Sequence, residues 1–171
     1  MGQAMARAST KSKPDRTQRA AAWRILIAHG VNLDLLGTRE PEIYGKTRLG
    51  EIDRELARAA SRLLADVGAP RAELTFFQTN DEAAFLNELA GGWDGIVINP
   101  GAWGHTSIAL ADRLAGLGMP YVEVHMSNVW GREEFRHHSW ISAKAAGVVV
   151  GFGADSYLVG LAGLLRLLSR S

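Results

Sequence analysis

The sequence contains no cysteine among its 171 residues. This absence excludes a disulfide framework, a zinc site built from thiolates and a cysteine nucleophile. It also fits a reducing compartment, and we expect a cytoplasmic protein.

Long apolar runs are missing as well. The stretch YLVGLAGLLRLL at residues 157–168 is too short to span a bilayer, and Arg166 interrupts it. We expect this stretch to form a packing helix, and we predict no membrane partner.

The first 22 residues differ from the rest in composition. They are polar, lack the apolar core of a secretory signal, and contain one acidic residue and five basic ones: Arg7, Lys11, Lys13, Arg16 and Arg19. Removing them from the totals of 19 basic and 18 acidic residues leaves 14 and 17, so the remainder is mildly acidic. We predict a disordered basic tail over residues 1–22, with a transit peptide as the alternative, and a single domain over residues 23–171. Because this domain has no basic stripe, we expect no nucleic-acid partner.

Short apolar runs alternate with segments of helical periodicity along the domain. The runs lie at residues 24–28, 73–78, 95–99, 121–125 and 147–152. The helical segments lie at residues 48–68, 80–92, 105–118 and 155–170. Such alternation is typical of βαβ units, and nearly continuous apolar strands are typical of sheets covered on both faces. The pattern predicts an α/β fold with a five-stranded parallel sheet and helices on both faces.

Polar residues follow four of the five predicted strands. They are His29 and Asn32; Gln78, Thr79 and Asn80; Asn99 and His105; and Glu123, His125, Ser127 and Asn128. Ligands of parallel α/β sheets bind outside the carboxyl ends of the strands. We therefore expect the functional site at this edge of the sheet.

Several common site motifs are absent. The sequence has no P-loop, no G-x-G-x-x-G opening a helix and no G-x-S-x-G nucleophile turn. The spacing of its five histidines matches no metal-binding signature. Phosphate, dinucleotide and metal binding are therefore disfavoured, and the strand-end residues favour acid–base chemistry.

One candidate for that chemistry is the pair Glu123 and His125. The two residues are two apart in a predicted strand, so their side chains point to the same face. A carboxylate beside an imidazole orients the ring and favours its protonated form. The alternative from spacing alone is an ordinary histidine at the rim of the core.

A second candidate lies in the long loop at residues 29–45, where Tyr44 follows Arg39 by five residues. Ionising a tyrosine at pH 7 costs about 4 kcal/mol. A guanidinium about 4 Å away offsets a similar amount at an intermediate dielectric. An Arg–Tyr pair could therefore provide a tyrosinate base. In the alternative, Tyr44 packs and Arg39 pairs with Glu40 or Glu42.

Three blocks of the sequence together resemble one enzyme family. They are NLDLLGTREPEIYG at residues 32–45, INPGAWGHTSIALADRL at residues 98–114, and PYVEVHMSNVWGREEFRHHSW at residues 120–140, followed by GVVVGFGADSYLVGL. The chain resembles type II 3-dehydroquinate dehydratases over nearly all of its length after residue 23. The resemblance implies a flavodoxin-like fold, a homododecamer built from trimers, a small-molecule substrate and no cofactor or metal.

The resemblance also implies a reaction. This is the removal of water from 3-dehydroquinate, through an enolate, to give 3-dehydroshikimate in the shikimate pathway or in quinate catabolism. By resemblance, Tyr44 is the base and Arg39 keeps it ionised. Asn32 holds the water that stabilises the enolate oxygen. His125 protonates the departing hydroxyl, and Glu123 orients it.

Further residues take binding roles by the same resemblance. Asn99 holds the acid in place and contacts the substrate. Ser127, with the backbone amides after it at Asn128, binds the carboxylate. His105 and Arg136 bind the ring hydroxyls.

The resemblance also explains the length of the loop, which becomes a lid that closes over the substrate. We predict weak order over residues 37–45 without ligand, with Gly37 and Gly45 as hinges. Arg132 would secure the lid region, and Asp112 would act near the site of a neighbouring subunit.

The sequence departs from the family pattern at several positions. His29 and Val31 stand where asparagine and proline are usual, and Gly104, Ala111 and Trp130 also differ. These departures keep open a catalytically weak relative that binds or serves a structural role. A flavin or phosphate binder is a further alternative.

Overall fold

The computed structural model describes residues 22–38, 46–69 and 71–170. Its strands form one parallel sheet in the order β2-β1-β3-β4-β5. The strands are β1 (Trp23–His29), β2 (Ala72–Gln78), β3 (Gly95–Asn99), β4 (Tyr121–His125) and β5 (Gly147–Val150). This is the flavodoxin-like strand order, and the predicted five-stranded parallel sheet is confirmed.

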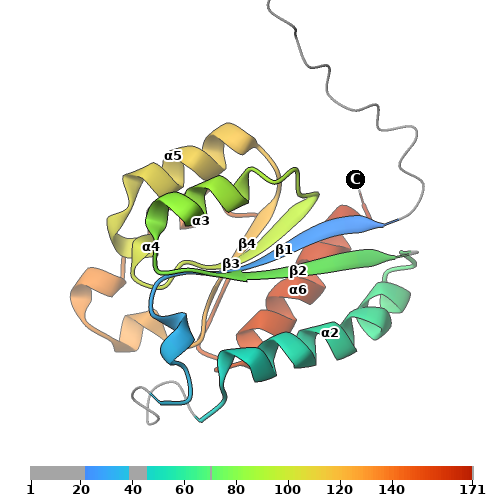
Figure 1. The fold of residues 1–171 in the computed structure, drawn as a ribbon, viewed down its shortest axis with the longest axis horizontal. Coiled ribbons are helices and arrows are strands. Elements are labelled where there is room, and N and C mark those ends of the chain that lie inside the picture. Colours follow the sequence, from blue (N-terminus) through green and yellow to red (C-terminus); the bar gives the residue numbers. More distant parts are fainter. Residues whose placement is uncertain (1–21, 39–45, 70, 171) are drawn as a thin grey trace, which may run out of the picture.

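Helices cover both faces of the sheet (Figure 1). One face carries α2 (Leu49–Asp66) and α6 (Asp155–Leu168), and the other carries α3 (Glu82–Leu89), α4 (Trp103–Thr106) and α5 (Ile108–Leu117). Short 3-10 helices occur in the loops: η2 (Leu33–Leu35), η3 (Val129–Gly131), η4 (Glu134–Arg136) and η5 (Ser142–Lys144). Within the described residues, none of the helices combines the length and apolar character needed to cross a bilayer.

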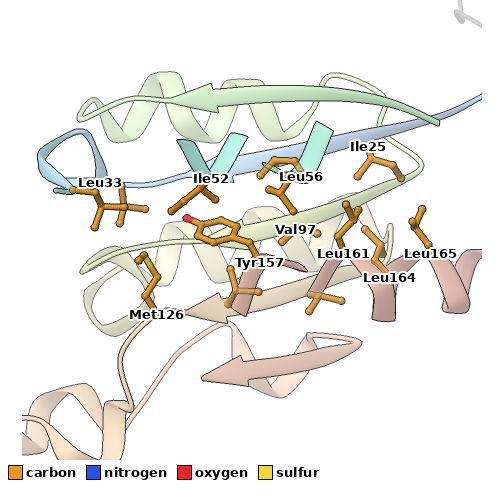
Figure 2. Packing of buried hydrophobic residues seen from close by; sticks show 14 of the residues in the cluster. Ile25, Leu33, Ile52, Leu56, Val97, Met126, Tyr157, Leu161, Leu164 and Leu165 are labelled. Carbon is orange, nitrogen blue, oxygen red and sulfur yellow. The ribbon is translucent and has the colours of Figure 1, made fainter. Parts of the chain in front are cut away.

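The core consists of two apolar layers, one on each face of the sheet. The layer under α2 and α6 includes Ile25, Ile27, Val97, Tyr157, Leu161 and Leu164 (Figure 2). The layer under α3 and α5 includes Leu26, Ile96, Ile98, Phe85, Leu110 and Leu114. Neighbouring residues of β1 and β3 thus enter opposite layers, because successive side chains of a strand point to opposite faces.

Burial distinguishes the inner strands from the edge strands. Every residue of β3 and β4 is buried, whereas most of β2 and β5 is only partly buried, and Val148 in β5 is 44% exposed. The expectation that apolar strands are covered on both faces therefore holds for the inner strands. It fails at the edges, where each strand has a neighbouring strand on one side only.

The predicted helix over residues 105–118 is two helices in the structure. Ser107 adopts an extended conformation, with φ −103° and ψ 104°, which separates α4 from α5. Its hydroxyl accepts a hydrogen bond from the backbone N–H of Leu110 at 2.9 Å, which caps α5. The prediction of one continuous helix was wrong because a cap interrupts the periodic pattern.

Helix α6 approaches the sheet closely at Gly160. A Cβ atom there would lie 2.6 Å from Cγ1 of Val124, and 3.5 Å from Cγ1 of Val122 and of Val97. Only a residue without a side chain fits at this contact. Gly163 lies in the same helix, but a Cβ atom there would meet no atom within 4 Å.

This pair of glycines gives a test of the packing. Gly160→Ala should lower the free energy of unfolding by about 1–3 kcal/mol through overpacking. Gly163→Ala, as the matched control, should raise it by about 0.5–1 kcal/mol through helix propensity. Urea denaturation followed by circular dichroism measures both, and effects of the same sign would contradict the packing.

Candidate active site

An open cavity lies at the carboxyl edge of the sheet. The loops after β1, β3 and β4 form it, around the point where the strand order reverses between β1 and β3. This is the usual ligand position in doubly wound sheets. The predicted residues that line it are Asn32, Asn99, His105, His125, Ser127 and Arg136. Their apolar neighbours include Leu33, Leu36, Met126 and Val129.

The loops after β1 and β3 meet at Gly30. A Cβ atom on Gly30 would lie 2.2 Å from the backbone oxygen of Pro100, so a residue with a side chain cannot occupy this position without moving one loop. The backbone N–H of Gly30 also donates to the oxygen of Asn99 at 2.8 Å. These contacts fix the spacing between the two loops that carry Asn32 and Asn99.

Asn32 has a left-handed backbone conformation, with φ 64°. Asparagine tolerates this region better than most residues. Its backbone N–H donates to Oδ1 of Asn80 at 2.8 Å, and Nδ2 of Asn80 donates to both carboxylate oxygens of Asp34 at 3.2 Å. Asn80, which the sequence places at the rim without a role, thus holds the turn that presents Asn32.

Glu123 and His125 form a close pair at the end of β4. The Nε2 atom of His125 lies 2.7 Å from Oε1 of Glu123, and Glu123 is 0% exposed. Because a carboxylate only accepts, Nε2 carries the hydrogen, and Nδ1 of His125 remains for a ligand in the cavity.

Two serines complete the surroundings of Glu123. Ser139 donates its hydroxyl to Oε1 at 2.6 Å, and Ser142 donates to Oε2. Burial alone would raise the pKa of Glu123, but the hydrogen bond and charge of His125, together with both serine hydroxyls, lower it below its usual value. Sequence reasoning missed both serines, which lie 16 and 19 positions away from Glu123, beyond any local motif.

His105 lies beside His125, with its ring stacked on that of His125 at 5.6 Å between centroids and 23° between planes. Its Nδ1 atom donates to the backbone oxygen of His138 at 2.7 Å. The pKa of His105 lies below its usual value, mainly because the ring is partly buried. The positive charges of His125 and Arg136 lower this pKa further. A neutral ring of this kind keeps Nε2 as an acceptor for a ligand hydroxyl.

The remaining wall of the cavity carries positive charge. Arg132 donates from Nη1 to the hydroxyl of Ser127 at 3.4 Å, and Nε of Arg136 lies 2.9 Å from Oε2 of Glu133. The same Oε2 atom of Glu133 also lies 3.2 Å from Nε of Arg132. One exposed carboxylate thus arranges two guanidinium groups near Ser127, which favours an anionic ligand group there.

Two of the predicted substrate-binding residues do not line this cavity. Asn128 is exposed, and its Oδ1 caps η3 by accepting from the backbone N–H of Trp130 at 3.2 Å. Asp112 lies on α5, in a shallow groove shared with α3 that includes Leu86 and Arg113.

Tyr44, Arg39 and the predicted hinge Gly45 lie outside the described residues, so the base, its partner and the lid remain predictions. Among the described residues, no group of three or more histidine, aspartate or glutamate side chains is arranged to hold a metal ion.

Comparison with known proteins assigns the chain to a family. The family described as Dehydroquinase class II matches residues 23–165. The 3-dehydroquinate dehydratase of Prochlorococcus marinus is 48% identical over 149 residues, which cover 85% of this chain and 98% of the relative. That of Geotalea daltonii is 50% identical over 141 residues, with coverage of 81% and 93%.

Solved structures agree with this assignment. The type II dehydroquinase of Butyrivibrio crossotus superposes with a TM-score of 0.76 at 35% identity, covering 84% of this chain and 97% of that one. The type II dehydroquinase of Propionibacterium acnes gives a TM-score of 0.69 at 36% identity, with coverage of 88% and 98%. The resemblance noted in the sequence is confirmed, and the chain belongs to the class II dehydroquinase family.

Proposed function

We propose that this dehydroquinase removes water from 3-dehydroquinate to give 3-dehydroshikimate, and that the cavity at the carboxyl edge of the sheet is its active site. The observation that carries the proposal is the His125–Glu123 pair at the cavity, in a chain of this family. A buried carboxylate that orients an imidazole is the arrangement that a general acid needs.

The reaction needs two proton transfers. A base removes a proton from the carbon next to the ketone, and the electron pair moves onto the ketone oxygen as an enolate. The enolate then collapses to the conjugated ketone and expels the hydroxyl, which leaves as water after taking a proton from His125. Glu123 accepts from Nε2 of His125 and compensates the positive charge that the ring carries as an acid.

The base in this proposal is Tyr44, kept ionised by Arg39 on a lid formed by residues 37–45. This assignment rests on the family resemblance and on the comparable sizes of the cost of ionising a tyrosine and the attraction of a nearby guanidinium. Asn32 would hold a water molecule against the enolate oxygen. The turn fixed by Asn80 supports such a role, because preorganised donors stabilise developing charge.

The substrate offers a carboxylate and several hydroxyls for binding. In the proposal, Ser127 and the following backbone amide of Asn128 take the carboxylate, near the guanidinium groups of Arg132 and Arg136. His105 would accept from a ring hydroxyl through Nε2, since its Nδ1–H is used by His138. No cofactor enters this reaction.

Assembly and pathway follow from the family in the same way. We propose a homododecamer built from trimers, in which Asp112 in the groove between α3 and α5 acts near the site of a neighbouring subunit. The enzyme would serve the shikimate pathway or quinate catabolism.

An assay of the purified protein with 3-dehydroquinate tests the proposed activity. Formation of the conjugated enone should appear as growing ultraviolet absorbance. If the absorbance does not increase at any pH between 6 and 9, the protein is a member of the family that has lost turnover. A yellow preparation would point to a flavin binder instead.

Replacement of the proposed base gives a sharper test. Tyr44→Phe should lower kcat by at least roughly 100-fold, because a phenyl ring cannot take the proton. Binding of a substrate analogue, measured by calorimetry, should change little. Tyr121→Phe is the matched control, since it also removes one hydroxyl, which donates to the backbone oxygen of Ile141. Near-wild-type turnover in Tyr44→Phe would remove this tyrosine from the mechanism.

Replacement of Glu123 tests the ion pair in two ways. Glu123→Gln should lower kcat by roughly 100-fold, because the amide cannot compensate the charge of the acid. The lowered pKa of Glu123 also contributes stability that is present above its unfolded value of 4.5 and is lost as the pH falls through the lower folded value. The free energy of unfolding of the wild type should therefore fall relative to that of Glu123→Gln as the pH drops from 7 toward 3. Parallel curves over that range would show that the carboxylate does not titrate as an ion pair.

A further inference from the structure

The loop after β2 meets the turn after β1 at one side of the cavity. His29 and Gln78 are partners at the ends of the two neighbouring strands, so the segments that follow them start side by side. Nε2 of Gln78 donates to the backbone oxygen of Gly30 at 3.4 Å. Two residues after Gln78, the side chain of Asn80 contacts the backbone of Asn32.

The turn at Asn32 needs such a contact from outside. Among the described residues, Asn32 is the only one other than glycine with a positive φ. It precedes η2, a position at which an asparagine side chain commonly caps the helix, but here its side chain makes no capping hydrogen bond. Instead, Asn32 lines the cavity, while the next residue, Leu33, is buried in the apolar layer under α2 and α6 (Figure 2). The side chain of Asn32 therefore does not stabilise its own turn.

The amide of Asn80 bonds to the turn in one defined orientation. Its Oδ1 accepts from the backbone N–H of Asn32 at 2.8 Å and from Nε2 of Gln78 at 3.1 Å. Its Nδ2 donates to both carboxylate oxygens of Asp34 at 3.2 Å. A backbone N–H only donates and a carboxylate only accepts, so a reversed amide would lose its bonds to Asn32 and Asp34 together. Asp34 thus selects the orientation in which Oδ1 faces Asn32.

We propose that Asn80 is a positioning residue for the reaction: its amide, oriented by Asp34, holds the left-handed turn that places Asn32 at the cavity. The proposal rests on the proposed function, in which Asn32 holds a water molecule against the enolate oxygen. Because the enolate develops only along the reaction, loosening this turn lowers kcat more than it weakens substrate binding.

The location of the network separates this role from a structural one. Asn32, Asp34 and Asn80 are all exposed, so replacing Asn80 opens no cavity in the core. Substitutions at such surface positions usually change stability little. A kinetic loss in a protein that still melts at the wild-type temperature therefore reports on the turn and not on folding.

An exchange of the two side chains is the sharpest test. Asn80→Asp keeps an acceptor for the N–H of Asn32 but sets two carboxylates against each other. The double variant Asn80→Asp/Asp34→Asn restores a donor–acceptor pair with the direction reversed, and it still offers Asn32 an acceptor. The double variant also has the net charge of the wild type, so it controls for added negative charge near the cavity. Asp34→Asn alone leaves an acceptor for Nδ2 of Asn80 and controls for the loss of one charge.

Steady-state kinetics with 3-dehydroquinate compare these variants. Asn80→Asp should lose about tenfold in kcat with KM changed by less than about twofold. The double variant should recover kcat to within about threefold of the wild type, as should Asp34→Asn, because interacting residues are non-additive. A double variant no more active than Asn80→Asp would overturn the proposal. So would wild-type kcat in Asn80→Asp, or a rise in KM with kcat unchanged.

A second measurement does not require turnover. Hydrogen–deuterium exchange of the full-length protein, read by mass spectrometry on peptides that contain residues 30–35, reports how firmly the turn is held. Exchange should become faster in Asn80→Ala and Asn80→Asp and return toward the wild-type rate in the double variant. Unchanged exchange in all variants would overturn the positioning role. An inactive wild type would contradict the proposed function instead, and the exchange data would still decide whether Asn80 holds the turn.

Discussion

The rest of the site depends on the hydrogen bonds that surround the buried carboxylate of Glu123. A carboxylate removed from water stays charged only where donors replace the lost solvent, and here one imidazole and two serine hydroxyls do so. The same bonds tie β4 to the segment that carries Ser139 and Ser142. They therefore hold His125 in one orientation and anchor the wall of the cavity at once. The hydrogen bonds that compensate the charge of Glu123 are therefore the same ones that place the segment with Ser139 and Ser142.

The fold was largely predictable because its signals are local. Strands β3 and β4 are short and mainly apolar, with Asn99, Glu123 and His125 as their polar residues, and the structure begins and ends them at the predicted residues. The structure differs from the prediction where the local sequence pattern carries no information about the elements that pack around it. The edge strands contain apolar runs as the inner ones do, but they lack a neighbour on one side. Ser107 interrupts a helical pattern that continues in the sequence. Edge position and capping depend on the assembled structure.

The site was predictable only in part, for a related reason. Parallel strands bring their carboxyl ends together, so Asn32, Asn99 and His125 could be placed at one edge from the strand pattern alone. The residues that support them come from elsewhere: Asn80 is 48 positions from Asn32, and Ser139 is 16 positions from Glu123, the partner of His125. Such contacts leave no periodic or motif signal in a single sequence. The roles of Tyr44 and Arg39 rest on family resemblance and not on contacts of the described residues.

The backbone contact between Gly30 and Pro100 has a consequence for how this protein can change over evolutionary time. Because the two loops meet without an intervening side chain, neither can shift, lengthen or acquire bulk on its own. This contact does not restrain the segment that carries Trp130 and Phe135, whose side chains are exposed. The backbone of the two loops is thus constrained at Gly30, whereas the side chains beside it, such as His29 and Val31, can differ without altering this contact.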